Sequence, residues 1–102
     1  MQNTIKLGFI EDPAHGWLLA PRELVEELGI ADQVSRYSYL SRHNIVALEE
    51  DRDAGLLLRA IEARGLAAHI EHTSCDGDAP VRRWDSYPAA APSEGRAFSW
   101  AG

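Results

Sequence analysis

The chain has 102 residues, which is enough for one domain with a modest core and too few for two. Its hydrophobic fraction of 45% and charged fraction of 25% are typical of a folded chain, and they exclude a disordered one. The 16 acidic residues against 10 Lys and Arg give a net charge of -6, which disfavours direct binding to nucleic acid.

The single cysteine, Cys75, excludes a disulfide within the chain. The first residues lack the apolar stretch of a signal peptide, and no apolar run approaches the roughly 18 to 20 residues needed to span a bilayer. These features predict a cytoplasmic protein without a membrane segment.

The first elements follow from periodicity. Residues 5–10 alternate between two faces and predict a strand, and the apolar run 17–20 predicts a second strand paired with it as a hairpin. A helix is predicted after Pro21 and ends at Gly29. Its apolar face faces inward, and its opposite face carries three glutamates, which are Glu23, Glu26 and Glu27.

The middle of the chain predicts a second hairpin and a second helix. Residues 34–40 and 44–50 both alternate, so they are expected to form antiparallel strands at the centre of the sheet. A helix is predicted over the following apolar repeat up to Gly65, with Asp51 or Asp53 as its N-cap.

The last part predicts a strand at 66–71, a loop at 75–80 and an edge strand at 81–87. Residues 88–102 are expected to form a flexible segment, and docking of its aromatic residues Phe98 and Trp100 is left open. The prediction is therefore one α+β domain at 1–87. It has a small, mainly antiparallel sheet of four to six strands and two helices, in the order β-β-α-β-β-α-β(-β).

The densest charge feature is the acidic cluster Glu49, Glu50, Asp51 and Asp53, which joins a strand end to a helix start. Carboxylates here favour the positive end of the helix dipole, which is a purely structural explanation. They also suit an acidic surface for a basic partner. The other acids expected on that surface are Glu11, Asp12, Glu23, Glu26 and Glu27.

Aromatic residues supply the second candidate surface. Tyr37 and Tyr39 lie two residues apart in a predicted strand, so they share a face and form a partly exposed patch. Trp17 is expected in the core. The basic cluster at 82–83 is expected to form salt bridges within the chain.

No catalytic motif is complete. His69-Ile70-Glu71 matches half of the zinc deaminase signature, but the cysteine pair that must follow is missing. His69, His72 and Cys75 are competent metal ligands, yet their spacing matches no established metal site. We therefore expect no enzyme activity, no cofactor and no metal, and keep a small metal-binding protein or enzyme using these three residues as an alternative.

Four short strings carry a resemblance to small uncharacterised acidic proteins of bacterial phages and plasmids. They are EDPAHGWL at 11–18, ELGIAD at 27–32, Tyr-Ser-Tyr at 37–39 and LEED at 48–51, and the resemblance covers about residues 10–87. It implies no catalytic residues. It implies a mobile-element context, in which inhibitors of host defence, including anti-CRISPR proteins, are expected by analogy.

The sequence thus predicts a non-enzymatic protein-binding domain, an inhibitor of a nucleic-acid-handling defence complex. This chain is predicted to contact a basic surface of its partner. The predicted contact residues of this chain are Glu49, Glu50, Asp51, Asp53, Glu23, Glu26, Glu27, Tyr37 and Tyr39. A homodimerisation module that uses the tyrosine face or an edge strand is the remaining alternative.

Overall fold

The first two strands form the predicted hairpin. In the computed structural model, which describes residues 3–88, β1 is Thr4–Glu11 and β2 is Gly16–Pro21. They pair antiparallel, with Phe9 opposite Leu18. Asp12 starts the turn between them, because its Oδ1 accepts hydrogen bonds from the backbone N–H groups of Ala14 and His15. The hairpin prediction is confirmed.

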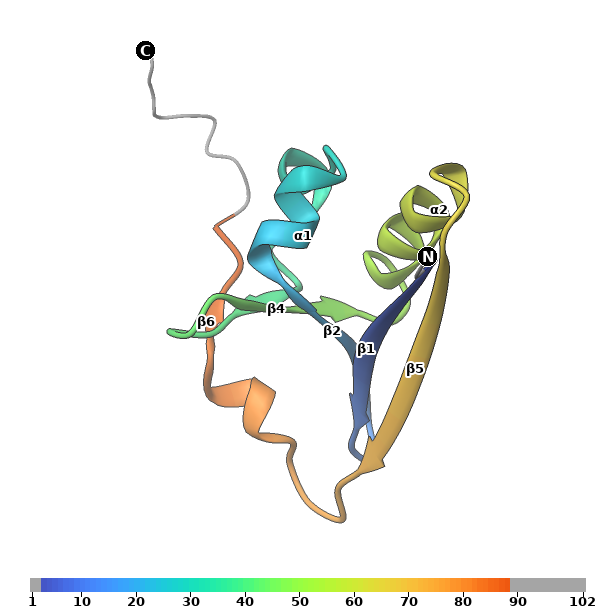
Figure 1. Cartoon of the computed structure of the whole chain (residues 1–102). Helices are drawn as coiled ribbons and strands as arrows, with labels where there is room; N and C mark the ends of the chain where they lie inside the picture. The colour runs from blue at the N-terminus through green and yellow to red at the C-terminus, as the bar shows by residue number, and fades with distance from the viewer. Residues whose placement is uncertain (1–2, 89–102) are drawn as a thin grey trace, which may run out of the picture.

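Two helices cover one face of the sheet (Figure 1). Helix α1 is Arg22–Glu27 and helix α2 is Ala54–Ala63. The chain turns after them at Gly29 and Gly65, whose φ angles of +75° and +73° favour glycine. Both helices were predicted, with these glycines as their ends.

Four further strands complete the sheet: β3 Tyr39–Leu40, β4 Ile45–Glu49, β5 Ala67–Ser74 and β6 Asp85–Ser86. The order across the sheet is β5-β1-β2-β4-β3-β6. Strands β1 and β5 are parallel, and the other neighbours are antiparallel. The α+β class is therefore confirmed, but the sheet is mixed, and of the predicted central hairpin only β4 is a central strand.

Alternation along the strands divides the apolar side chains between two cores. The larger core lies between the sheet and the helices and contains Leu7, Leu18, Val46, Leu48 and Leu57. The smaller core lies on the opposite face, where Trp17 and Ala47 are covered by Ala79 and Val81. Trp17 is buried, as predicted. The segment after β5 thus takes the place of a helix layer on this second face.

Two predicted strands are shorter than expected. Residues 34–38 are not a strand, and only Tyr39–Leu40 pairs with β4, because residues 35–38 fold into turns after the 3-10 helix η1, Ala31–Gln33. In the predicted strand 81–87, the 3-10 helix η2, Pro80–Arg83, is followed by the two-residue β6. Pro80 at the first position suits such a helix, which buries Val81.

Two predictions concern the ends of elements. The strand predicted at 66–71 is β5, which continues to Ser74 along β1. The flexible segment at 88–102 lies outside the described residues except for Pro88, so it stays a prediction, as does the docking of Phe98 and Trp100. Within residues 3–88, no helix combines the length and the apolar character needed to cross a membrane.

Gly16 provides a first test of this packing. A methyl group at Gly16 would lie 2.5 Å from Phe9 Cζ and 2.9 Å from Glu50 Oε1. We expect Gly16→Ala to lower the free energy of unfolding by about 1 to 3 kcal/mol, as overpacking does. Gly77→Ala is the matched control, because no atom lies within 4 Å of its added methyl group. Chemical denaturation giving equal stabilities for the two variants would contradict this packing.

Candidate functional site

A surface pocket of about 390 Å³ opens on the sheet face opposite the two helices. Alternation places Trp17 of β2 and Glu49 of β4 on this face, where they are direct cross-strand partners. We call this site the aromatic pocket. Its lining residues come from four segments of the chain and are His15, Trp17, Tyr37, Tyr39, Glu49, Asp51, Arg52 and Arg82.

Aromatic rings form much of the pocket wall. The rings of Trp17 and Tyr39 meet edge to face with centroids 6.2 Å apart, and the His15 ring lies 6.1 Å from Trp17. Tyr37 is 59% exposed at the pocket rim. Trp17 Nε1 is buried and has no acceptor among the described residues. The indole N–H of Trp17 is therefore a buried donor behind the wall that the described residues leave unpaired.

Two arginines stack on these rings. The guanidinium carbon of Arg52 lies 4.6 Å from the Tyr37 ring centroid, and that of Arg82 lies 5.1 Å from the Trp17 centroid. Both distances are within the range of cation–π attraction. The rings of this pocket thus already face cationic groups of the same chain.

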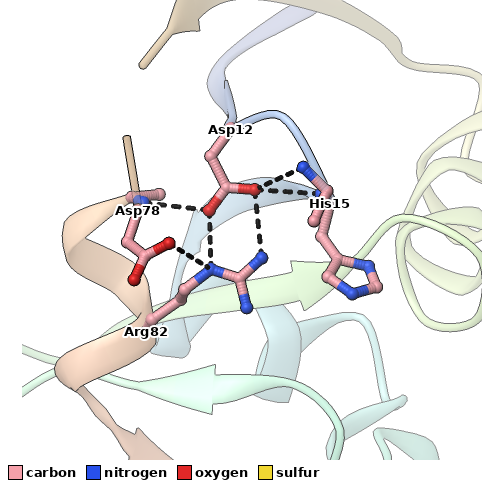
Figure 2. Close-up of polar contacts among 6 residues, drawn as sticks. Asp12, His15, Asp78 and Arg82 are labelled. Atoms are coloured by element: carbon pink, nitrogen blue, oxygen red, sulfur yellow. Dashed lines mark hydrogen bonds and ion pairs between the residues drawn. The ribbon is translucent and has the colours of Figure 1, made fainter. Parts of the chain in front are cut away.

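Arg82 is held in place by the buried carboxylate of Asp12 (Figure 2). Arg82 Nε donates to Asp12 Oδ2 at 2.6 Å, and Arg82 Nη2 donates to Oδ1 at 3.0 Å. The backbone N–H of Ala79 also donates to Oδ2, at 2.9 Å. The hydrogen bond from Arg82 is the main cause that holds the pKa of Asp12 far below its ordinary value, and the hydrogen bond from Ala79 is the second. The pairing with Asp12 also raises the pKa of Arg82.

A second buried carboxylate, Asp53, holds the segment that carries the tyrosines. Its Oδ2 accepts hydrogen bonds from Ser38 Oγ at 2.6 Å, from Ser35 Oγ at 2.7 Å and from the Ser35 backbone N–H at 3.0 Å. Ser38 Oγ in turn accepts the backbone N–H of Glu49 at 2.9 Å. These bonds connect residues 35–38 to the end of β4, and therefore fix the side of the pocket where Tyr37 and Tyr39 lie.

The pocket's own carboxylates are not neutralised in the same way. None of the ion pairs found in residues 3–88 involves Glu49 or Asp51. Arg82 is paired with Asp12, so Arg52 is the cation at the pocket that has no ion-pair partner among these residues. Among the charged residues that line the pocket, two carboxylates and one arginine thus have no ion-pair partner in residues 3–88. The pocket therefore favours a cationic ligand over an anionic one.

The structure brings part of the predicted site together. Glu49, Asp51, Tyr37 and Tyr39 all line the aromatic pocket. Asp53 does not: its side chain points into the interior and the residue is only 3% exposed. Asp53 stands at the N-cap position of α2, but its carboxylate makes no capping hydrogen bond, so the predicted capping role is wrong. Its three bonds to Ser35 and Ser38 are the reason.

The remaining predicted acids lie elsewhere. Glu23, Glu26 and Glu27 are exposed on α1, and Glu26 forms an ion pair with Arg22 at 3.4 Å. Glu23 and Glu26 border a different cavity, next to Pro21 and His43. Glu50 is exposed in the turn after β4 and does not line the aromatic pocket. Asp12, expected on the acidic surface, is buried beneath Arg82 instead. The internal salt bridge predicted for the basic cluster is confirmed for Arg82, whereas none of the ion pairs found in residues 3–88 involves Arg83.

The metal alternative does not gain a site from the fold. His72 contacts the Phe9 ring at a centroid distance of 5.2 Å, whereas His69 lies on the opposite face of β5 beside Lys6. Within residues 3–88, no group of three or more His, Cys, Asp or Glu residues is arranged to hold a metal ion. His69, His72 and Cys75 are thus not gathered into a metal site in this part of the chain.

Sequence reasoning missed four lining residues of the pocket: His15, Arg52, Arg82 and, as a pocket wall, Trp17. Trp17 was assigned to the core alone, although a tryptophan is large enough to be buried and still form a wall. Arg52 carried a usable signal, because it lies within the acidic cluster and its charge opposes that of its neighbours.

Comparisons of this chain with protein-family models, with curated proteins and with solved structures find no match. The resemblance to phage and plasmid proteins therefore stays a prediction.

Proposed function

We propose that this chain is a non-enzymatic protein-binding domain whose aromatic pocket receives an arginine or lysine side chain of its partner. The observation that carries the proposal is the combination of ring faces with two carboxylates that have no ion-pair partner in residues 3–88. A cation entering the pocket would meet the exposed Tyr37 ring and the carboxylates of Glu49 and Asp51. Cation–π contacts contribute about 0.5 to 2 kcal/mol each, and charge-assisted hydrogen bonds are stronger than neutral ones.

The surroundings of the pocket support the same partner chemistry. Asp78, which is 89% exposed, lies 4.0 Å from Nε of the pocket residue Arg82. It extends the negative rim beyond the pocket itself, and the whole chain carries a net charge of -6. Such a rim steers a basic partner toward the pocket and repels nucleic-acid phosphates.

The partner we propose is a protein that itself binds nucleic acid, because such proteins present arginine and lysine side chains on their binding surfaces. We place the encounter in the cytoplasm, and propose that it inhibits a host defence complex, on the anti-CRISPR analogy drawn from the four sequence strings. The acidic rim would occupy the surface that otherwise holds a phosphate backbone. No direct contact with nucleic acid is required.

The pocket can be tested without knowing the partner. The probe is the blocked tripeptide Gly-Arg-Gly, titrated into labelled protein while the indole N–H signal of Trp17 is followed by NMR. We expect saturable shifts with a dissociation constant of about 1 mM, which corresponds to roughly 4 kcal/mol of binding free energy. Gly-Gln-Gly should produce no saturable shift, because it lacks the charge.

A matched pair of double variants separates the pocket from general acidity. Glu49→Gln with Asp51→Asn should weaken Gly-Arg-Gly binding at least about tenfold, because both carboxylates at the pocket are removed. Glu23→Gln with Glu27→Gln changes the net charge equally on α1, away from the pocket, and should leave binding unchanged. Equal weakening by both pairs, or an equal response to Gly-Gln-Gly, would refute the proposed cation site.

A further inference from the structure

Strand β5 forms one edge of the sheet, and its outer side is unpaired among the described residues. Its neighbour is β1, with a continuous parallel register from Thr4 beside Ala67 to Glu11 beside Ser74. The Ala67 N–H donates to Asn3 and the Cys75 N–H donates to Glu11, so the odd-numbered residues of β5 direct their backbone groups toward β1. The even-numbered residues therefore direct theirs outward.

This edge lacks several of the features by which proteins block strand addition. It is eight residues long, Ala-Ala-His-Ile-Glu-His-Thr-Ser, with no proline, no lysine and no bulge in its register with β1. The opposite edge, β6, has only two residues and is followed by Pro88. Short strands and prolines protect an edge, whereas a long uninterrupted strand is a template for pairing.

We propose that the outer edge of β5 pairs antiparallel with β5 of a second copy of this chain, with Ile70 on the twofold axis. In this register, His69 lies opposite the partner's Glu71, and Glu71 lies opposite the partner's His69. Both residues are exposed on the face opposite the helices, and their backbone groups point to β1. They form the close, non-hydrogen-bonded type of cross-strand pair, in which the side chains interact directly and the His69 imidazole can donate a hydrogen bond to the facing carboxylate.

Neighbouring registers lack this complementarity. An axis at Glu71 places two glutamates opposite each other, and an axis at His69 places two histidines together. The residue on the axis at Ile70 is apolar and half-buried against the helix-side core, so its counterpart extends that core across the interface. The sequence of β5 is therefore self-complementary in one antiparallel register.

A second copy can present its β5 directly to this edge, whereas the described part of the chain ends at the opposite edge. The described chain leaves the sheet after β6, at the edge opposite β5 (Figure 1). The four strands between β6 and β5 separate the two edges by roughly 24 Å at the usual strand spacing. Pairing between two copies does not require a segment to cross the sheet, because β5 is an edge strand in each copy.

Sedimentation of the full-length chain at several concentrations tests the proposal. We expect a reversible monomer–dimer equilibrium for the natural chain. His69→Glu should weaken the dimer at least tenfold, because each new carboxylate faces the partner's Glu71. His69→Glu combined with Glu71→His restores the complementary pair and should return the dimerisation constant to within about threefold of the natural value.

His43→Glu makes the same charge change at an exposed position outside β5 and should leave dimerisation unchanged. Circular dichroism of each variant establishes that it is folded. A natural chain that stays monomeric at about 0.5 mM, or a double variant as weak as His69→Glu alone, would overturn the proposal. Neither result bears on the aromatic pocket, since β5 contributes no residue to it.

Discussion

Asp12→Asn is expected to lower the melting temperature by more than about 10 °C. The Asp12 side chain is 1% exposed and accepts hydrogen bonds from the backbone of Ala14, His15 and Ala79 and from two nitrogens of Arg82. Asparagine has the same shape but lacks the charge that Arg82 neutralises. Its side-chain NH₂ group would also face N–H groups of the protein, which are donors and cannot accept a hydrogen bond from it. Arg82 is then left partly buried without its counter-ion.

The same variant changes how stability depends on pH. The pKa of Asp12 is lower in the folded chain than its ordinary value of 3.8. Its contribution is therefore fully present above about pH 4, and is lost as the pH falls toward the folded-state pKa. The stability difference between the natural chain and Asp12→Asn should be constant between about pH 5 and 8, and should shrink below about pH 4. Chemical denaturation at pH 7, 4 and 3 measures it.

Asp78→Asn is the control for Asp12→Asn. Asp78 is also near Arg82, with Oδ1 4.0 Å from Nε, but its side chain is 89% exposed. Exposed ion pairs contribute little, so this variant should lose less than about 1 kcal/mol. A similar loss in both variants would mean that general charge, and not the buried pairing of Asp12, stabilises the turn.

Asp53→Ala should lower the free energy of unfolding by about 3 kcal/mol, since hydrogen bonds to a charged group contribute about 1.5 to 3 kcal/mol each and are not additive. For a domain of this size that corresponds to a melting temperature roughly 12 to 24 °C lower. The loss has a clear cause: Ser38 Oγ is fully buried, and the Ser35 N–H would lose its acceptor. Thermal unfolding followed by circular dichroism measures the shift.

Asp51→Ala is the matched control for Asp53→Ala. The two aspartates are two residues apart, and both were candidates for the same capping role, but Asp51 is exposed and makes none of the hydrogen bonds found for Asp53. Its removal should change stability by less than about 0.5 kcal/mol. If Asp51→Ala destabilised the chain as much as Asp53→Ala, the hydrogen bonds from residues 35–38 to Asp53 would not be the cause of the stabilisation.

The sequence predicted the elements that depend on local pattern. Period-two alternation located β1 and β4, and helical spacing with a following glycine located α2. It failed at residues 34–38 because a strand-like alternation there is overridden by the hydrogen bonds between Asp53 and Ser35 and Ser38. The parallel pairing of β1 with β5 was also missed, since alternation shows which face is buried and not which strand lies alongside.

The candidate site was predictable only in part, for the same reason. Glu49 and Asp51 were visible as an acidic run, and Tyr37 and Tyr39 as a spaced pair, but nothing local indicated that both belong to one pocket. Arg82 could not be matched to Asp12 at a separation of 70 residues. An Asp-Pro turn and an arginine pair are each common, and only the fold joins them.

The contact between Asp12 and Arg82 also determines when this domain can finish folding. Ribosomes add about 5 to 20 residues per second, so roughly 4 to 14 s separate the synthesis of these two side chains. Until β5 is made, β1 lacks its parallel neighbour, and until η2 is made, the Trp17 face of the growing sheet has no cover. The nascent chain therefore displays its largest buried ring to the cell during synthesis, and becomes a closed domain only once η2 has been made.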